Sequence, residues 1–402
     1  MVVRFQYLLD LGLGENKLVL KNARIAPRCM LMHLSLKSCN LSGQIPIWIS
    51  NQTDLTFLDL SNNNLEGTLP QWLAQRDLSG LLLSNNKLSG SLPPHLFQSQ
   101  SLNFLILSNN NLLGLLPDTI GQATEMKMLR LSGNNFSGPI PTSISNMLKL
   151  VLLDLSSNRF SSHQFPVFNP NSSLLYVDLS SNKLSGQVPT TFPLGIKVLV
   201  LSQNEFSHVL PQNLSNLNQL EYLDLHSNNI GGEIPNSLGG LKNLKSLNLS
   251  QNKLSGRIPL SFGGLQSLES LDLSHNNFFG EIPCTLANLF ELSYLDLSNN
   301  KLEGRIPSGP QMDRMDEPNS YANNSGLCGM QINISCEKVP SEPKLKEEKT
   351  KKSNSWEIWF SWEMAVIGYP SGFLSTVLVM YVIGYFNITP QPGRRKKKKK
   401  PC

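Results

Sequence analysis

Leucine and polar residues alternate along most of the chain in a pattern that returns about every 24 residues. Clear copies are LTFLDLSNNNLEGTLP at 55–70 and YLDLSNNKLEGRIP at 294–307. In each L-x-L stretch, the leucines face one side of a short strand and the intervening residues face the other side. One copy cannot bury its leucines alone, so neighbouring copies must stack. The pattern predicts a solenoid with a leucine core and one parallel sheet of short strands.

The shared template reads L-x-L-x-x-N-x-L-x-G-x-I-P, and its N position recurs twelve times. It falls at Cys39, Asn63, Asn86, Asn110, Asn134, Asn158, Asn182, Asn204, Asn228, Asn252, Asn276 and Asn300. We expect this Asn to be buried at the turn after the strand, where its amide bonds backbone groups that no strand ladder reaches. The Gly four positions later permits a tight turn, and the Pro seven positions later suits an extended segment.

Two repeats depart from the template. After Asn158, Ser162 replaces the Gly and the Pro moves to Pro166. After Asn204, His208 replaces the Gly. Because these are the positions that shape the turn, we expect local irregularity in both repeats.

The repeats predict an α/β repeat solenoid over residues 31–308, a curved right-handed superhelix with a parallel sheet on its concave side. Residues 1–30 keep leucines but lose the template, so we interpret them as a degenerate N-terminal segment. Residues 309–337 are expected to cap the other end of the stack, with Cys328 and Cys336 joined in a disulfide.

The C-terminal region is predicted to anchor the chain in a membrane. After a juxtamembrane linker at 338–363, residues 364–386 contain 23 positions without a charge, enough for a transmembrane helix. Gly368 and Gly372 form a G-x-x-x-G, a pattern that lets two such helices pack closely. The tail at 387–402 is short and basic, which predicts a cytoplasmic side and a single-pass, type I arrangement.

Sites for N-linked glycans precede the predicted membrane helix. The Asn-x-Ser/Thr triplets are at Asn40, Asn51, Asn135, Asn171, Asn213, Asn248, Asn323 and Asn333. An Asn- and Ser-rich repeat also produces such triplets by chance. Their position on one side of the span agrees with an extracellular, glycosylated region.

No enzyme motif emerges from the sequence. The chain lacks G-x-S-x-G, H-E-x-x-H and a phosphate-binding loop, and the 16-residue tail cannot hold a kinase domain. We therefore predict no enzymatic activity, no cofactor and no metal. The net charge of +5 is concentrated in the tail, so nucleic acid is not an expected partner.

An aspartate recurs at the x of L-x-L, and it has two interpretations, one of which is a polar ligand track on the concave face. The column comprises Asp59, Asp154, Asp178, Asp224, Asp272 and Asp296. The interpretation we favour is a repeated surface residue that is hydrogen-bonded within the sheet.

Outward-facing residues that vary between repeats are the candidates for ligand binding, since aromatic and Arg side chains are favoured at interfaces. These candidates are Phe104, Ile106, Met128, Arg130, Tyr176, Asp178, Tyr222, Asp224, His226 and Tyr294. Packing of the same side chains against their neighbours is the alternative.

The repeat with SGxIP, the segment YANNSGLCG, the uncharged span and the short tail together resemble plant leucine-rich-repeat receptor-like proteins, which lack a kinase. The resemblance implies a plasma-membrane protein that senses an extracellular peptide or protein ligand, in defence or development. It also implies signalling through partner receptor kinases that act as co-receptors or adaptors, contacted by the repeats around Asn228, Asn252, Asn276 and Asn300. Members usually have a signal peptide, an N-terminal cap and more repeats, so we interpret this chain as N-terminally truncated.

Two other functions remain open. An extracellular inhibitor similar to the polygalacturonase-inhibiting repeat proteins would use the same fold without a membrane span. A truncated copy without function would also preserve the repeats.

Overall fold

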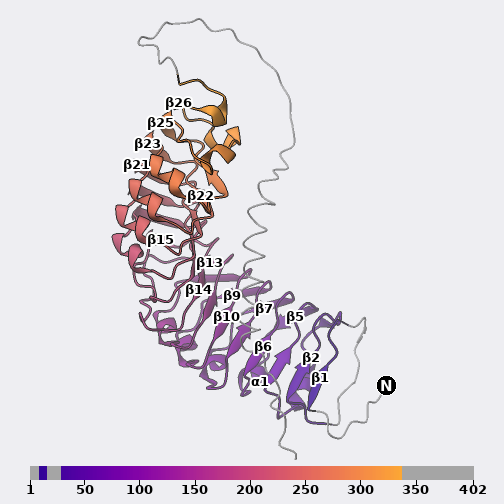
Figure 1. Cartoon of the computed structure of the whole chain (residues 1–402). Helices are drawn as coiled ribbons and strands as arrows, with labels where there is room; N and C mark the ends of the chain where they lie inside the picture. The colour runs from indigo at the N-terminus through magenta and orange to yellow at the C-terminus, as the bar shows by residue number, and fades with distance from the viewer. Residues whose placement is uncertain (1–8, 16–28, 337–402) are drawn as a thin grey trace, which may run out of the picture. The chain divides into compact units, whose positions relative to one another are not determined.

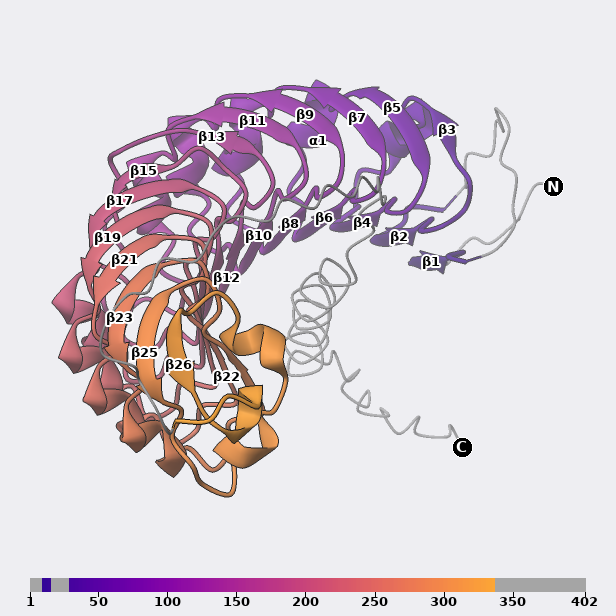
Figure 2. The ribbon, with the colours of Figure 1, turned by 90° about the horizontal axis from the view of Figure 1, so that it is seen from above.

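The computed structural model describes residues 9–15 and 29–336, which belong to one unit spanning Met1–Val339 (Figure 1). Short parallel strands build a 13-stranded sheet along the inner side of a curved stack (Figure 2). Its strands are β1 (Asp10–Gly12), β2 (His33–Ser35), β4 (Phe57–Asp59), β6 (Gly80–Leu82), β8 (Phe104–Ile106), β10 (Met128–Arg130), β12 (Leu152–Asp154), β14 (Tyr176–Asp178), β16 (Val198–Val200), β18 (Tyr222–Asp224), β20 (Ser246–Asn248), β22 (Ser270–Asp272) and β24 (Tyr294–Asp296). The predicted solenoid with a parallel concave sheet is confirmed.

The register of the inner sheet places the template leucines in one file. Leu58 lies between Leu34 and Leu81 in the adjacent strands, and all three are fully buried. The same alternation continues to Leu295 in β24. Stacked repeats thus bury what a single repeat would expose, which is the main source of stability in such a chain.

A second row of strands follows the buried Asn of each repeat, and the sequence analysis did not predict it. One sheet comprises β3 (Ser42–Gly43), β5 (Asn64–Thr68), β7 (Lys87–Gly90), β9 (Asn111–Gly114), β11 (Asn135–Gly138) and β13 (Arg159–Phe160). The other comprises β15 (Ser185–Gln187), β17 (Glu205–Val209), β19 (Asn229–Glu233), β21 (Lys253–Gly256), β23 (Asn277–Glu281), β25 (Lys301–Arg305) and β26 (Gly326–Cys328). The template glycine lies in or beside these strands, and Gly67 has a φ of +85° that other residues rarely adopt.

Single-turn helices occupy the outer side of most repeats, and each follows the template proline. They are η1 (Ile47–Asn51), α1 (Gln71–Ala74), η2 (Pro94–Gln98), η3 (Asp118–Gln122), η4 (Thr142–Asn146), η5 (Gln212–Asn216), η6 (Asn236–Gly240), η7 (Leu260–Gly264) and η8 (Cys284–Asn288). The η elements are 3₁₀ helices. Pro70 and Pro259 are extended residues that precede a helix, as their fixed φ and missing N–H allow.

The template asparagines form a hydrogen-bonded ladder between repeats, as predicted. Asn252 donates from Nδ2 to the carbonyls of Leu225 (2.9 Å), Leu249 (3.2 Å) and Ser250 (3.1 Å). Its Oδ1 accepts the N–H of Ile230 at 3.0 Å. Each Asn therefore joins its own turn to the preceding repeat, and it satisfies buried backbone groups that the strands leave unpaired.

Both ends of the ladder differ from its middle. Cys39 substitutes for Asn, and its single S–H lies within hydrogen-bonding distance of the carbonyls of Leu13 (3.1 Å) and Lys37 (3.5 Å). At the other end, Asn324 adds a thirteenth position inside the predicted cap, donating to the carbonyl of Leu297 at 2.9 Å. The inner sheet also begins one strand before residue 31, because Asp10–Gly12 pairs in register with His33–Ser35.

The C-terminal cap contains the disulfide that the sequence predicts, between Cys328 and Cys336. Three further 3₁₀ helices lie in this region: η9 (Met312–Arg314), η10 (Pro318–Tyr321) and η11 (Met330–Ile332). Met312 and Tyr321 are buried against the last repeat, so the end of the leucine core is covered.

The two expected irregularities have different outcomes. After Asn158, β13 has only two residues and the second row of strands is interrupted before β15. After Asn204, β17 remains a five-residue strand, although His208 takes a φ of +70° where other repeats have Gly. The first expectation is confirmed. In the second repeat the strand is regular, and only the backbone of His208 departs from the usual range.

The predicted linker at 338–363, the membrane helix at 364–386 with Gly368 and Gly372, and the basic tail at 387–402 lie outside the described residues. Within residues 9–15 and 29–336, no helix has the length and apolar character needed to cross a membrane.

Candidate ligand-binding surface

The outward residues of the inner strands form two columns on the concave face. We call the first residues of the strands the first column and the third residues the third column. Register pairs Phe104 with Met128 in the first column, and Ile106 with Arg130 in the third. Consecutive strands lie about 4.8 Å apart. These four predicted site residues are therefore direct neighbours.

The remaining candidates extend along the same face. Tyr176 and Asp178 belong to β14, two strands beyond Arg130, and Tyr222 and Asp224 belong to β18. Tyr294 lies three strands further, with 44% of its surface exposed. The candidates thus share one face, spread over the strands from β8 to β24, and they do not gather in a closed pocket. Met128 and Tyr176 are only 1% and 7% exposed, so the alternative of packing against neighbouring side chains holds for these two.

The aspartates of the third column accept hydrogen bonds from the residue two positions later, in the turn that follows each strand. Asp272 accepts both the N–H of Ser274 (3.0 Å) and its hydroxyl (2.7 Å). Asp178 and Ser180 repeat this arrangement at 2.9 and 2.7 Å. These contacts support the favoured interpretation of the Asp column as residues hydrogen-bonded within the sheet.

Arg130 and His226 pair with aspartates of this column. Arg130 Nε lies 3.2 Å from Asp154 Oδ2, which also accepts the Ser132 hydroxyl at 2.8 Å. His226 replaces the usual Ser after Asp224, and its Nδ1 lies 2.7 Å from the carboxylate. Arg130, and His226 when it is protonated, therefore partly neutralise a column that is otherwise acidic.

Burial and crowding alter proton binding at the centre of the column. Burial, followed by repulsion from Asp154, raises the pKa of Asp178 to about 7 despite the hydrogen bonds from Ser180. Burial alone would lower the pKa of His226, but the hydrogen bond with Asp224 outweighs it and the pKa is raised. Burial first and the nearby Asp178 second raise the pKa of Tyr176, whose hydroxyl donates to Asp178 at 3.4 Å. A cationic ligand group would relieve the repulsion between these carboxylates.

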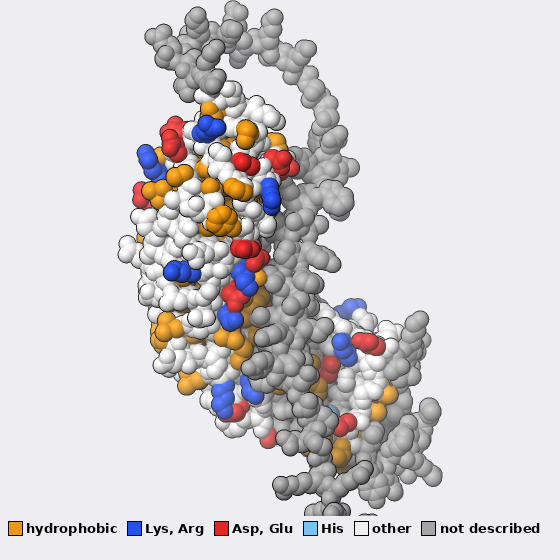
Figure 3. Space-filling view, in the orientation of Figure 1, with side chains coloured by type: hydrophobic (Ala, Val, Ile, Leu, Met, Phe, Trp, Pro, Cys, Tyr) orange, Lys and Arg blue, Asp and Glu red, His pale blue; other side chains and the backbone are white. Residues whose placement is uncertain are grey.

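A row of opposite charges runs beside the first column, and the sequence analysis missed it. Glu221 lies 2.9 Å from Lys197 and 3.1 Å from Lys245, the residues before neighbouring strands. Lys149 pairs similarly with Glu125 at 2.6 Å. Acidic and basic side chains lie next to one another on the visible face in Figure 3. The recurrence of opposite charges at a spacing of 24 residues was the available signal.

The described part of the chain holds no group of three His, Cys, Asp or Glu side chains arranged to bind a metal ion. The concave face offers aromatic, acidic and hydrogen-bonding groups in an open row. Its geometry is that of an extended recognition surface.

Leucine-rich-repeat family profiles match more than half of the chain. One, described as "Leucine rich repeat", covers 172–230 and 234–278. The other, "Leucine Rich Repeat", covers 30–52, 54–75, 77–99, 101–123, 125–147 and 291–311. The fold and these matches define a leucine-rich-repeat protein.

Individual relatives show which leucine-rich-repeat proteins this chain is most usefully compared with. The chain is 44% identical over 71 residues to Receptor-like protein 46 of Arabidopsis thaliana, covering 18% of this chain and 9% of that one. The solved Arabidopsis receptor kinase HAESA, in complex with the peptide hormone IDA and the co-receptor SERK1, is similar with a TM-score of 0.70 and 37% identity. That match covers 77% of this chain and 51% of HAESA.

A second solved structure, the plant peptide hormone receptor RGFR1 in complex with RGF2, gives a TM-score of 0.64 and 34% identity over 74% of this chain and 52% of that one. The chain thus spans about half the length of these two receptors. It belongs to the leucine-rich-repeat family and is similar to plant leucine-rich-repeat receptors and receptor-like proteins.

Proposed function

We propose that the chain binds an extracellular peptide or protein ligand on the concave face between β8 and β24. The observation that carries the proposal is the set of non-template side chains that share the concave face, among them Phe104 on β8, Arg130 on β10 and Tyr222 on β18. Two similar solved structures are described as plant receptors in complex with peptide hormones, which supports a ligand of this class.

The charge of the third column favours a ligand with basic side chains. Asp154, Asp178 and Asp224 face the same side of the sheet, and the raised pKa of Asp178 reflects the cost of holding its charge there. A Lys or Arg side chain would stabilise the ionised carboxylates, while tyrosines in the first column would contact its aliphatic stem. This preference separates the proposed ligand from an acidic peptide.

The proposed signalling role needs partners. We place the protein at the plasma membrane, anchored by residues 364–386, and we propose that receptor kinases serve as its co-receptors in defence or development. Support comes from the likeness to Receptor-like protein 46 and from HAESA, which was solved with a co-receptor. Co-precipitation of the full-length chain with membrane receptor kinases tests this part, and failure to recover any kinase argues against it.

Binding itself is tested with two synthetic peptides of equal length, one rich in Arg and Lys and the other rich in Glu. We expect calorimetry on the full chain in detergent to show binding of the basic peptide only. Asp224→Asn should weaken that binding, and Glu66→Gln, an exposed change on the second row of strands, should not. Equal affinity for both peptides, or equal effects of both variants, would contradict the proposed ligand class.

A further inference from the structure

The row of outer helices has a gap two repeats long. Between η4 and η5, the described residues of the repeats that follow Asn158 and Asn182 contain no helix. In both, a second proline stands four residues after the first: Pro170 after Pro166, and Pro193 after Pro189. Proline lacks an N–H and restricts the residue before it, so a single helical turn is disfavoured at this place.

The gap is filled only in part by aromatic side chains. Phe165 lies 6.2 Å from Phe168 and 6.0 Å from Phe192, measured between ring centroids. Outside this cluster, Val167 is 67% exposed and Leu194 is 52% exposed. The missing helices therefore leave an apolar strip on the outer side of the stack.

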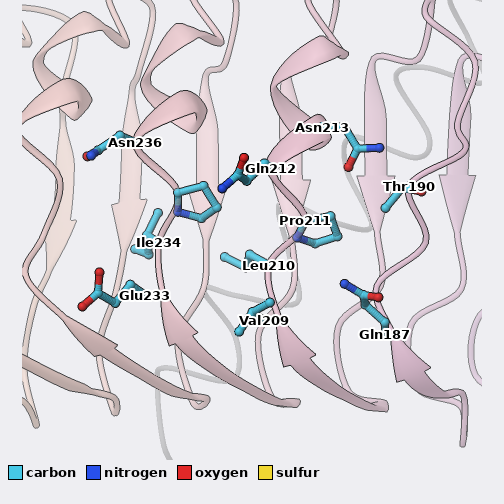
Figure 4. A pocket seen from close by; sticks show the side chains of 11 residues that line it. Gln187, Thr190, Val209, Leu210, Pro211, Gln212, Asn213, Glu233, Ile234 and Asn236 are labelled. Atoms are coloured by element: carbon cyan, nitrogen blue, oxygen red, sulfur yellow. The ribbon is translucent and has the colours of Figure 1, made fainter.

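A hollow of about 480 Å³ adjoins the gap (Figure 4). Its apolar lining includes Val209 and Pro211, and its polar lining includes Gln187, Thr190 and Asn213. Asn213 lies on η5, the first helix after the gap, so its side chain stands at the rim. Amide and hydroxyl groups beside aliphatic surface can contact both the hydroxyls and the C–H faces of a sugar.

The glycosylation triplets are placed unequally relative to this gap. Asn171 is exposed in the first helix-free repeat, and Asn213 is exposed at the rim of the hollow. By contrast, Asn248 belongs to the inner sheet, and its Oδ1 accepts the N–H (3.0 Å) and the hydroxyl (2.7 Å) of Ser250. Asn323 donates from Nδ2 to Oδ1 of Asn299 in the preceding repeat at 2.7 Å.

We propose that N-linked glycans on Asn171 and Asn213 cover the gap, with the first sugar of the Asn213 glycan seated in the hollow. In the modification, Asn Nδ2 forms a bond to C1 of a lipid-linked oligosaccharide, the lipid diphosphate leaves with the bonding electron pair, and one amide proton is released. The inference rests on the extracellular location in the proposed function. It assigns to the glycans the shielding of Val167 and Leu194, which lie exposed in the two helix-free repeats, and of Val209, which lines the hollow.

The test uses the full chain expressed in plant cells and glycopeptide mass spectrometry. We expect glycans on Asn171 and Asn213, and an unmodified Asn248. Ser215→Ala removes the Asn213 triplet without changing the Asn, whereas the matched Ser215→Thr retains it. Ser215→Ala should therefore lose the mass of one glycan and Ser215→Thr should not.

Hydrogen exchange over residues 207–216 tests whether the first sugar of the Asn213 glycan lies in the hollow. We expect slower exchange in the Ser215→Thr protein than in the Ser215→Ala protein, and a lower aggregation temperature in the latter. Equal exchange and equal aggregation would overturn the shielding role. Occupied triplets elsewhere with Asn171 and Asn213 bare would overturn this inference alone, whereas a chain without any glycan would contradict the extracellular location as well.

Discussion

Replacing one ladder asparagine should destabilise its own repeat and the repeats beside it. Asn252, only 8% exposed, makes four hydrogen bonds, to the carbonyls of Leu225, Leu249 and Ser250 and from the N–H of Ile230. Asn252→Ala removes all of them and leaves buried backbone groups without partners. At about 1 kcal/mol net for each bond, and more for a buried group left unpaired, we expect a loss of about 3–5 kcal/mol.

The loss should be local, because stability in a repeat stack comes from each repeat and its immediate neighbours. Native-state hydrogen exchange on the full chain measures this directly. We expect the Ile230 amide to lose its protection from exchange. The amides of Phe206 and Leu254, which donate to Asn228 and Asn276 in the flanking repeats, should be less protected than in the unmodified chain. The Leu88 amide, bonded to Asn110 far along the stack, should keep its protection.

Two variants serve as controls. Asn229→Ala changes an exposed Asn in β19 and should alter stability by less than about 0.5 kcal/mol. Asn252→Cys should lose less than Asn252→Ala, because the thiol of Cys39 lies within hydrogen-bonding distance of two carbonyls at the same template position. If Asn252→Ala lost no more stability than Asn229→Ala, the asparagine ladder would not hold the repeats together.

Other consequences can be tested on the same chain. Gly239→Ala should cost about 1–3 kcal/mol in urea unfolding, because a Cβ there would lie 2.2 Å from the Ser261 carbonyl, whereas Gly240→Ala, which meets nothing within 4 Å, should be tolerated. Burial favours a higher pKa for Glu221, but Lys197 and Lys245 outweigh it and lower the pKa. Its stabilising effect is therefore present above the unfolded pKa of about 4.3 and lost as pH falls through the folded value, so Glu221→Gln should flatten the acid limb of a pH–stability curve. Reducing the Cys328–Cys336 disulfide should destabilise the cap by about 2–4 kcal/mol, measured as faster exchange of the Leu327 amide, with little change at Leu88.

The template leucines and asparagines could be predicted from the sequence because each has a role that repeats with every turn of the stack. Leu58 and Asn252 occupy the same structural positions as the equivalent residues of other repeats, so the pattern is seen many times in one sequence. The second row of strands was missed because its backbone bonds leave a weaker pattern. In β5, for example, only Leu65 is buried, and exposed or half-buried residues surround it.

The binding surface and the helix gap were harder to predict because both depend on departures from the template. Tyr176 and Arg130 differ from their counterparts, and a difference alone does not distinguish ligand contact from a local pair such as Arg130 with Asp154. Pro170 and Pro193 were also visible in the sequence, but only the structure shows that the described residues of their repeats contain no helix. In a repeat protein, the residues that recur in every repeat specify the fold, and the residues that depart from the template distinguish one part of the surface from another. The concave candidates and the gap should therefore respond independently to mutation, since they lie on opposite sides of the same leucine core.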